Sequence, residues 1–278
     1  MLRCSICVHD ERTAKIDVID GKPVCRECQV YLKHPPVDRE KVRKEVEELM
    51  KNVDKAVVAY SGGKDSVVTL YLAKEAYRVP ELEAVMIDHG LMAEEAIANA
   101  RRVAEALEVP FKVLRYDYSD IFREALLKAQ SPCRRCSRRT MEKLRKYAIK
   151  KGYRYIITGH ELPPFGHRPY RVMSGGGVVQ VRLLSMMSEE ERLKILERLP
   201  PFEFPELPGY TTNCLVLGPA LERYWGVHGH SFEQRRIAAL VRYGLMDREK
   251  AERELSKPNV PEWQRRLVME RLGIELEK

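Results

Sequence analysis

Seven cysteines are the residues of this sequence whose type and spacing most directly indicate chemistry. Six of them form three Cys-x-x-Cys pairs, and in chain order the seven are Cys4, Cys7, Cys25, Cys28, Cys133, Cys136 and the single Cys214. Tight pairs in an intracellular chain are typical of metal or redox sites, whereas disulfide scaffolds are short secreted domains. The spacing therefore separates a metal-like amino terminus from a body that carries three further thiols.

The two amino-terminal pairs predict a structural zinc site. Residues 8–24 separate the pairs, a spacing that suits four thiolates around one tetrahedral Zn²⁺ ion. Residues 15–19 are a short strand pattern and Asp20-Gly21 is a turn signal, so we predict a zinc ribbon too small to fold without its metal. A pair of redox disulfides is the alternative. The expected zinc ligands are Cys4, Cys7, Cys25 and Cys28.

A glycine-rich loop follows the first buried strand of the body. The apolar run 56–60 precedes it and residues 67–76 have helical spacing; the loop itself is Ser61, Gly62, Gly63, Lys64, Asp65 and Ser66. Glycines at such a junction let the backbone approach a phosphate, while the helix amino terminus, the hydroxyls and the lysine add hydrogen-bond donors and positive charge. The loop is a predicted phosphate site, with an ordinary glycine-rich turn as the alternative.

The second set of thiols lies among arginines. Cys133 and Cys136 are interleaved with Arg134, Arg135, Arg138 and Arg139, ahead of a predicted helix at 140–150. Such an electropositive setting is expected to lower thiol pKa values, and the run is also a candidate phosphate-binding surface. Together with Cys214, the pair fits an iron–sulfur cluster with one open iron, a zinc site completed by histidine, or a catalytic disulfide beside an unrelated buried cysteine.

The elements between these motifs alternate between strand and helix. Strand patterns occur at 83–88, 111–116, 153–158 and 178–184, with a helical pattern at 93–107 and a mostly helical segment after residue 188. Alternation of this kind predicts an α/β fold with a doubly wound parallel sheet, whose site lies at the carboxyl ends of the strands. Asp88, Gly159 and His160 are therefore expected at the same edge as the glycine-rich loop.

Composition limits the classes of partner. The 278 residues carry 49 Lys and Arg against 41 Asp and Glu, a formal net charge of +8 that suits a polyanion such as RNA or a nucleotide. No apolar run reaches the roughly 18 residues that a membrane span needs. We expect a cytoplasmic protein with no membrane partner.

The glycine-rich loop resembles the SGGKDS loop of the PP-loop ATP pyrophosphatase family, whose members cleave ATP between the α- and β-phosphates to adenylate a substrate. The resemblance implies that residues 61–66 bind the pyrophosphate of ATP and that Mg²⁺ lies near Asp65, with Lys64 and Asp65 catalytic. It also implies that Asp88, Gly159 and His160 contact adenosine.

The loop and the distal cysteines together resemble the iron–sulfur branch of that family, which makes 2-thiouridine or 2-thiocytidine in tRNA. One subgroup of this branch begins with a zinc ribbon, and the resemblance covers roughly residues 1–215. It implies a [4Fe-4S] cluster held by Cys133, Cys136 and Cys214, with the pair also catalytic. It implies tRNA as the partner, with sulfide or a carrier protein as sulfur donor. A homodimer is a further expectation.

Several residues depart from that branch. Glu161-Leu162-Pro163-Pro164 replaces the usual Asn-Leu-Asp-Asp, Thr140 replaces a lysine, and a second zinc ribbon is missing. Residues 242–251 resemble the tail of PP-loop sugar amidotransferases. The alternative functions are therefore an ATP-dependent amidotransferase acting on a small metabolite and a nucleotide-binding regulatory module.

The patterns divide the chain into four expected parts. These are the zinc ribbon at 1–36, a helical linker at 37–52, a PP-loop ATP-binding domain at 53–187, and a loop and helical tail at 188–278 that completes the site.

Overall fold

The computed structural model describes residues 1–34, 37–162, 168–199, 209–210 and 213–275. At the amino terminus, β1 (Ile16–Ile19) and β2 (Lys22–Cys25) pair as an antiparallel hairpin and lead into α1 (Arg26–Lys33). Asp20 and Gly21 join the strands with φ values of 48° and 74°, which is the backbone that Asp-Gly hairpin turns favour. The predicted strand and turn are therefore confirmed.

The body is built on one six-stranded sheet with the order β5-β4-β3-β6-β8-β7. The strands are β3 (Lys55–Ala59), β4 (Glu81–Asp88), β5 (Phe111–Arg115), β6 (Tyr155–Thr158), β7 (Tyr170–Val172) and β8 (Val179–Arg182). All neighbours are parallel except β7, which adds to the edge in the antiparallel sense. The predicted doubly wound parallel sheet is confirmed, with β7 as an addition.

Strand β3 marks the point where the chain reverses its direction across the sheet. From β3 the sheet grows through β4 to β5 on one side, and β6 and β8 then pair on the other side. In open α/β sheets the carboxyl ends of the strands diverge at such a point and leave room for a ligand. The glycine-rich loop follows β3 and therefore lies at this point.

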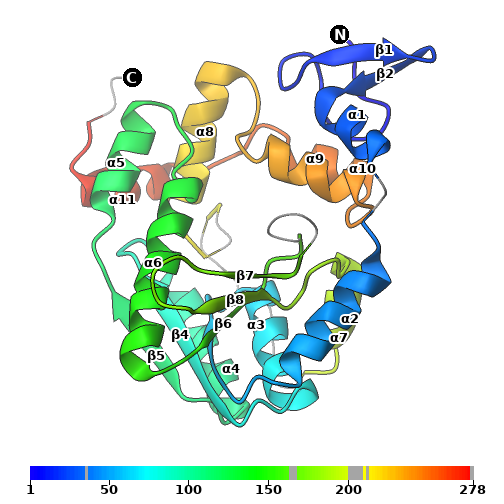
Figure 1. The fold of residues 1–278 in the computed structure, drawn as a ribbon. Coiled ribbons are helices and arrows are strands. Elements are labelled where there is room, and N and C mark those ends of the chain that lie inside the picture. The colour runs from blue at the N-terminus through cyan, green and yellow to red at the C-terminus, as the bar shows by residue number, and fades with distance from the viewer. Residues whose placement is uncertain (35–36, 163–167, 200–208, 211–212, 276–278) are drawn as a thin grey trace.

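Helices cover both faces of the sheet (Figure 1). They are α2 (Arg39–Met50), α3 (Lys64–Tyr71) continuing as the π-helix η1 (Leu72–Ala76), α4 (Glu94–Ala106), α5 (Ser119–Leu127), α6 (Cys133–Lys151) and α7 (Glu189–Leu196). Strand β3 alternates between two apolar cores, because Ala56 and Val58 pack with α2, α3 and α7 while Val57 packs with α5 and α6. Burial on both faces explains why its sequence is continuously apolar.

Helix α6 begins earlier than the sequence pattern indicated. We expected a helix at 140–150, but α6 starts at Cys133 directly after Pro132, so the Cys-x-x-Cys pair forms its first turn. The apolar spacing begins only at the buried Met141, because the first two turns are arginine-rich. Apolar periodicity therefore missed the amino-terminal half of the helix.

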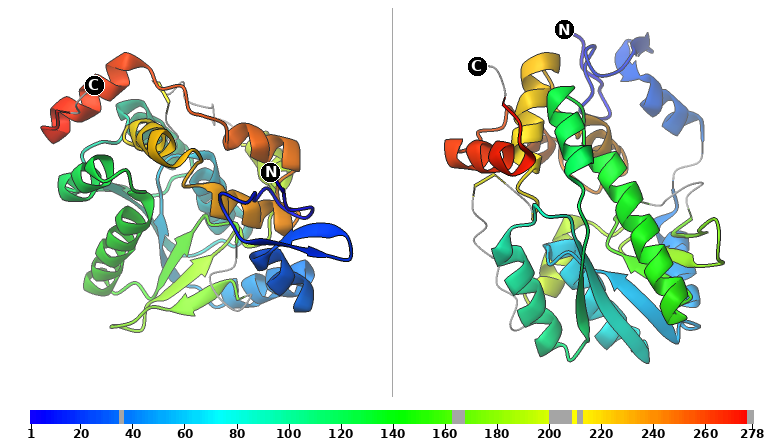
Figure 2. Two further views of the ribbon diagram at one scale, coloured as in Figure 1. Left: turned by 90° about the horizontal axis from the view of Figure 1, so that it is seen from above. Right: turned by 90° about the vertical axis from the view of Figure 1, so that its left-hand side faces the viewer.

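The carboxyl-terminal helices lie over the carboxyl edge of the sheet, with α9 and α10 beside the ribbon and α11 on the other side next to α5, as the views of Figures 1 and 2 agree. They are α8 (Leu217–His228), α9 (Gln234–Arg242), α10 (Arg248–Glu254) and α11 (Glu262–Leu272). Ala238 of α9 packs in the same apolar cluster as the four amino-terminal cysteines, and Arg248 of α10 donates to the carbonyl of Cys4 at 3.1 Å. These helices thus connect the ribbon to the body.

None of the helices in the described residues is long and apolar enough to cross a membrane.

Gly62→Ala is expected to lower the free energy of unfolding by roughly 2 kcal/mol or more, because φ is +78° and a Cβ would lie 2.7 Å from the carbonyl oxygen of Ala96. Gly152→Ala is the matched control, since its φ is +73° but no atom lies within 4 Å of the new Cβ. Urea unfolding of both variants should show the larger loss at Gly62. Equal losses would contradict close packing at the loop.

Candidate active site and metal centre

The glycine-rich loop is held from inside and from the carboxyl-terminal side. The Ser66 hydroxyl donates to the carbonyl of Gly63 at 2.8 Å, and the Asn213 amide donates to the carbonyl of Ser61 at 2.8 Å. Gly63 is the N-cap of α3 and provides no side-chain cap, so the first-turn amides of that helix face the loop without one. A helix amino terminus of this kind favours anions.

Lys64 faces a carboxylate that also binds a second lysine. Its ammonium pairs with Oε1 of Glu189 on α7, while Lys250 on α10 pairs with Oε2 of the same group. Burial alone would raise the pKa of Glu189, but the hydrogen bonds from Lys250 and Lys64 lower it to about 2. A polyphosphate entering the loop would therefore meet two ammonium groups around one carboxylate.

Asp65 forms the second charged pair of the loop. Its Oδ1 lies 2.8 Å from Nε of Arg192 on α7, whose side chain is only 7% exposed. Burial raises the pKa of Asp65, and Arg192 offsets part of that rise. A carboxylate oxygen in this position is a suitable ligand for Mg²⁺.

The three residues expected to contact adenosine have different surroundings. Asp88 is buried at the end of β4, where its carboxylate accepts from the amide of Gly90 at 2.9 Å. Gly159 packs against α3, since a Cβ there would lie 2.8 Å from Oγ1 of Thr69. His160 lies exposed on the wall of the cavity described next, and desolvation by the surrounding protein atoms, followed by the charge of Arg182, lowers its pKa to about 4. Their roles toward adenosine stay predictions.

One cavity of about 840 Å³ joins the loop to the distal thiols. Lys64, Asp65 and His160 line it on the loop side, and Cys133 lines it on the α6 side. Glu161 also lines it and lies 3.2 Å from Arg236, whereas the prolines at 163–164, which replace the usual acidic pair, lie outside the described residues. Residues of the predicted phosphate site, a thiol and carboxylates thus share one space.

The distal thiols do not have the lowered pKa values expected from the neighbouring arginines. Burial raises the pKa of Cys133 to about 12, with Glu233 adding to the rise, and burial also raises the pKa of Cys136. The prediction was wrong because burial outweighs the arginines: Arg139 does lower the pKa of Cys136, but by less than burial raises it, and Arg139 and Arg135 also pair with Asp120 and Glu124. Arg134 lines the cavity.

Cys214 lies beside the loop and near the other two distal thiols. The residues on either side of it form backbone hydrogen bonds to the segment after β4. The carbonyl of Asn213 accepts from the amide of Ala93, and the amide of Leu215 donates to the carbonyl of Leu91, both at 2.9 Å. Burial raises the pKa of Cys214 to about 12, and its charge contributes to the pKa of Cys133. Whether the three residues share a cluster stays a prediction.

The four amino-terminal cysteines form a compact group of ligands. Their Sγ atoms all lie within 4.8 Å of one another and all four residues are buried. Nε of Arg242 on α9 donates to Sγ of Cys28 at 3.2 Å. Four sulfur atoms at this separation suit one tetrahedral ion, and a donor to a ligating sulfur is typical of the surroundings of such sites.

Sequence reasoning missed the residues that face the loop from other elements. Glu189, Arg192 and Asn213 contact it, and Lys250 pairs with Glu189 behind Lys64. The capping-box pattern Ser188-x-x-Glu191 was a readable signal for the start of α7, but it did not show which glutamate faces Lys64.

Glu189→Gln is expected to change the acid dependence of stability. The folded-state pKa of Glu189 lies below its ordinary value of 4.5, so its contribution is fully present above pH 4.5 and is lost as pH falls toward 2. The free energy of unfolding of the variant should therefore fall less steeply over that range. Glu190→Gln, which removes an exposed pair with Lys194, is the control. Identical slopes for both variants in urea unfolding would contradict the ion-pair account.

Comparisons with known proteins identify relatives over most of the chain. Residues 37–163 match a family model described as a PP-loop domain. The uncharacterized protein MJ1599 of Methanocaldococcus jannaschii is 48% identical over 268 residues, which cover 94% of this chain and 95% of that protein. Cytoplasmic tRNA 2-thiolation protein 1 of Laccaria bicolor is 23% identical over 86% of this chain and 72% of its own length.

A solved structure, the U34-tRNA thiolase NcsA from Methanococcus maripaludis with its [4Fe-4S] cluster, aligns with a TM-score of 0.49 and 20% identity over 91% of this chain and 88% of that chain. The loop lies at the reversal point of the sheet, and the Methanocaldococcus relative matches almost end to end. Residues 37–163 are therefore a PP-loop domain, and the chain as a whole belongs to the same family as MJ1599.

Proposed function

We propose that this protein is an ATP-dependent tRNA sulfurtransferase that adenylates a base carbonyl and replaces the oxygen with sulfur. The observation that carries the proposal is the shared cavity, in which Lys64 and Asp65 of the loop and Cys133 line the same space. Thiolation needs the adenylated carbonyl to reach both a phosphate site and a sulfur site. One cavity that contains both meets this requirement.

The relatives and the charge support the choice of substrate. The Laccaria relative is a tRNA 2-thiolation protein, and the PP-loop domain is consistent with a transferase that uses ATP. A net charge of +8 favours a polyanionic partner. We further propose a cytoplasmic location, with sulfide or a carrier protein as sulfur donor. The homodimer stays a prediction.

The proposed first step is attack of the base carbonyl oxygen on the α-phosphorus of ATP, with pyrophosphate as the leaving group. Lys64, Lys250 and the first-turn amides of α3 would stabilise the charge on the departing pyrophosphate. Asp65 would hold Mg²⁺, which when bound would offset the negative charge of the phosphates. His160 is neutral near pH 7, because its pKa is about 4, and can hydrogen-bond a base or adenosine without adding charge.

In the second step a sulfide nucleophile attacks the activated carbon and AMP leaves with the original carbonyl oxygen. We propose that Cys133, Cys136 and Cys214 hold a [4Fe-4S] cluster, which when bound supplies an open iron to carry the sulfide. In the described part of the chain, the Sγ atoms of the four ribbon cysteines lie close enough together to bind a single ion. The Sγ atoms of the three distal cysteines do not form such a close group. A cluster binds its cysteines through separate irons, so it suits the wider arrangement.

For the ribbon we propose Zn²⁺, bound by Cys4, Cys7, Cys25 and Cys28. Support comes from the buried four-sulfur group, which fills a tetrahedral shell and leaves no open position for catalysis. The division into parts at residues 1–36, 37–52, 53–187 and 188–278 is likewise a proposal.

The function is tested by separating AMP formation from thiolation. Lys64→Ala and Asp65→Ala are expected to lower AMP formation by at least 100-fold, because each removes charge from the phosphate or metal site. Cys133→Ser, Cys136→Ser and Cys214→Ser are expected to bleach the reconstituted cluster and abolish thionucleoside formation while ATP binding persists. Lys194→Ala is the matched control, since Lys194 also pairs with a glutamate of α7 but is 62% exposed.

Anaerobic reconstitution, AMP assay and nucleoside analysis of tRNA provide the measurements. Full thiolation by the Lys64 and Asp65 variants would contradict the nucleotide site. A colourless protein that binds zinc alone and leaves tRNA unchanged would favour the amidotransferase instead.

The zinc proposal makes a separate prediction. Cys25→Ser is expected to lower zinc content and melting temperature together, because the site supports folding. Arg242→Ala, which removes the hydrogen bond to Cys28, should weaken zinc binding by about 10-fold or more in a chelator competition. Cys214→Ser is the control and should keep its zinc. Loss of catalysis in Cys25→Ser with unchanged zinc and stability would indicate a redox site.

A further inference from the structure

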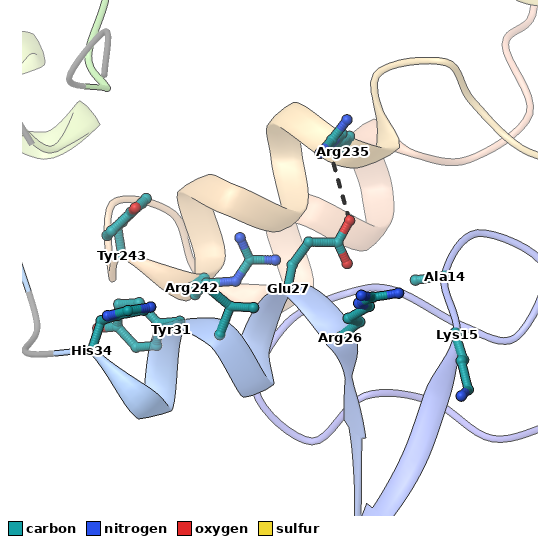
Figure 3. Close-up of a pocket in the computed structure, with 10 residues that line it drawn as sticks. Ala14, Lys15, Arg26, Glu27, Tyr31, His34, Arg235, Arg242 and Tyr243 are labelled. Carbon is teal, nitrogen blue, oxygen red and sulfur yellow. Dashed lines mark ion pairs between the residues drawn. The ribbon is translucent and has the colours of Figure 1, made fainter. Parts of the chain in front are cut away.

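A second cavity, of about 850 Å³, lies between helix α1 of the ribbon and helix α9 (Figure 3). We call it the ribbon groove and define it by Lys15, Arg26, Glu27, Tyr31, Arg235 and Tyr243. Its volume lies within the range of known ligand sites. None of these residues takes part in the proposed nucleotide or cluster sites, so the groove needs a separate explanation.

Positive charge from two elements surrounds the ribbon groove. Lys15 and Arg26 come from the ribbon, and Arg235 and Arg242 come from α9, against the single carboxylate of Glu27. Arg235 is 86% exposed and lies 3.9 Å from Glu27, which is a loose pair that a stronger anion can replace. Arg242 is already committed to Cys28. Lys15 lies 3.7 Å from Asp17 in another loose, exposed pair, so a phosphate chain can compete for Lys15 as well as for Arg235 and Arg26.

The groove also offers flat aromatic surface. The rings of Tyr31 and Tyr243 meet edge to face with centroids 5.6 Å apart, and both residues line the groove. Nucleotide bases have a face that stacks on aromatic rings of this kind.

Helix α9 lies between the groove and the cavity of about 840 Å³ that Lys64, Asp65 and Cys133 line, which we call the active cavity. Arg235 and Arg242 are seven residues apart, two helical turns, and face the groove, as Figure 3 shows. Glu233, Arg236 and Leu240 of the same segment line the active cavity instead. The two spaces are therefore separated by the width of one helix, which is roughly 10 Å. A chain bound in the groove therefore lies about one helix width from the wall that Glu233, Arg236 and Leu240 form.

We infer that the ribbon groove binds a single-stranded stretch of the RNA substrate, with phosphates on Arg26 and Arg235 and a base against Tyr31. An unpaired strand fits better than a duplex, because stacking on a tyrosine needs an exposed base face. This inference rests on the proposed function. It adds a second RNA-binding surface, outside the active cavity.

The test measures binding of a fluorescently labelled tRNA transcript to the zinc-loaded full chain at several salt concentrations. Arg26→Ala with Arg235→Ala should weaken binding by about 10-fold or more. The slope of log K against log salt concentration should become shallower by about 1.5, since each phosphate contact contributes roughly 0.7 to 0.9 to that slope. Lys51→Ala with Lys146→Ala is the charge-matched control, because both side chains are exposed and lie outside the groove. This control should bind like the wild type.

Tyr31→Leu tests the stacking separately from charge. It should weaken binding by about 10-fold without changing the salt dependence, while Tyr31→Phe keeps the ring and the affinity. Zinc content and melting temperature, measured for every variant, show that the ribbon remains folded.

The outcomes separate the inference from the proposed function. If the wild type binds tRNA and the groove variants bind with the same affinity and salt dependence, the inference is wrong and the sulfurtransferase proposal stands. If the wild type neither binds nor thiolates tRNA, both are wrong. Groove variants that keep tRNA binding but lose an acidic peptide bound by the wild type would assign the groove to a protein partner and overturn the inference.

Discussion

Close backbone packing at the reversal point of the sheet is the constraint on which the active site depends. Gly62 and Gly159 both lie where a Cβ would come within 2.9 Å of backbone or side-chain atoms, at Ala96 and at Thr69 and Asp65 respectively. The absence of side chains lets β3, β6, α3 and α4 converge. This convergence places the amino terminus of α3, Lys64 and Asp65 at the edge of the active cavity.

The charged side chains at this edge are paired with one another. Glu189 holds Lys64 and Lys250, and Arg192 holds Asp65, so α7 supplies a counter-charge for each charged loop residue. Helix α9 then links this cavity to the ribbon, with Arg242 on Cys28 and Ala238 in the cysteine cluster. The metal site is thereby connected to the wall of the active cavity, so the proposed zinc would help to position α9.

The local patterns of the sequence predicted the framework well. Apolar runs ending in a glycine-rich loop identified β3 and α3, and the Asp20-Gly21 signal identified the hairpin, because both depend on neighbouring residues. The start of α6 was missed because its first turns carry arginines in place of an apolar stripe. Thiol pKa values were misjudged because the local sequence does not show how deeply Cys133 and Cys136 are buried, and burial outweighs the nearby arginine charge. Contacts such as Lys250 with Glu189 join distant segments and have no local signal.

The origin of the oxygen in AMP tests the central claim most directly. Adenylation of the base carbonyl transfers that oxygen to AMP when sulfide displaces it. A tRNA substrate labelled with oxygen-18 at the target carbonyl, incubated anaerobically with the reconstituted protein, ATP and sulfide, should give one labelled AMP for each thionucleoside, as measured by mass spectrometry. Unlabelled AMP accompanying thiolation would contradict base adenylation and the account of the shared cavity.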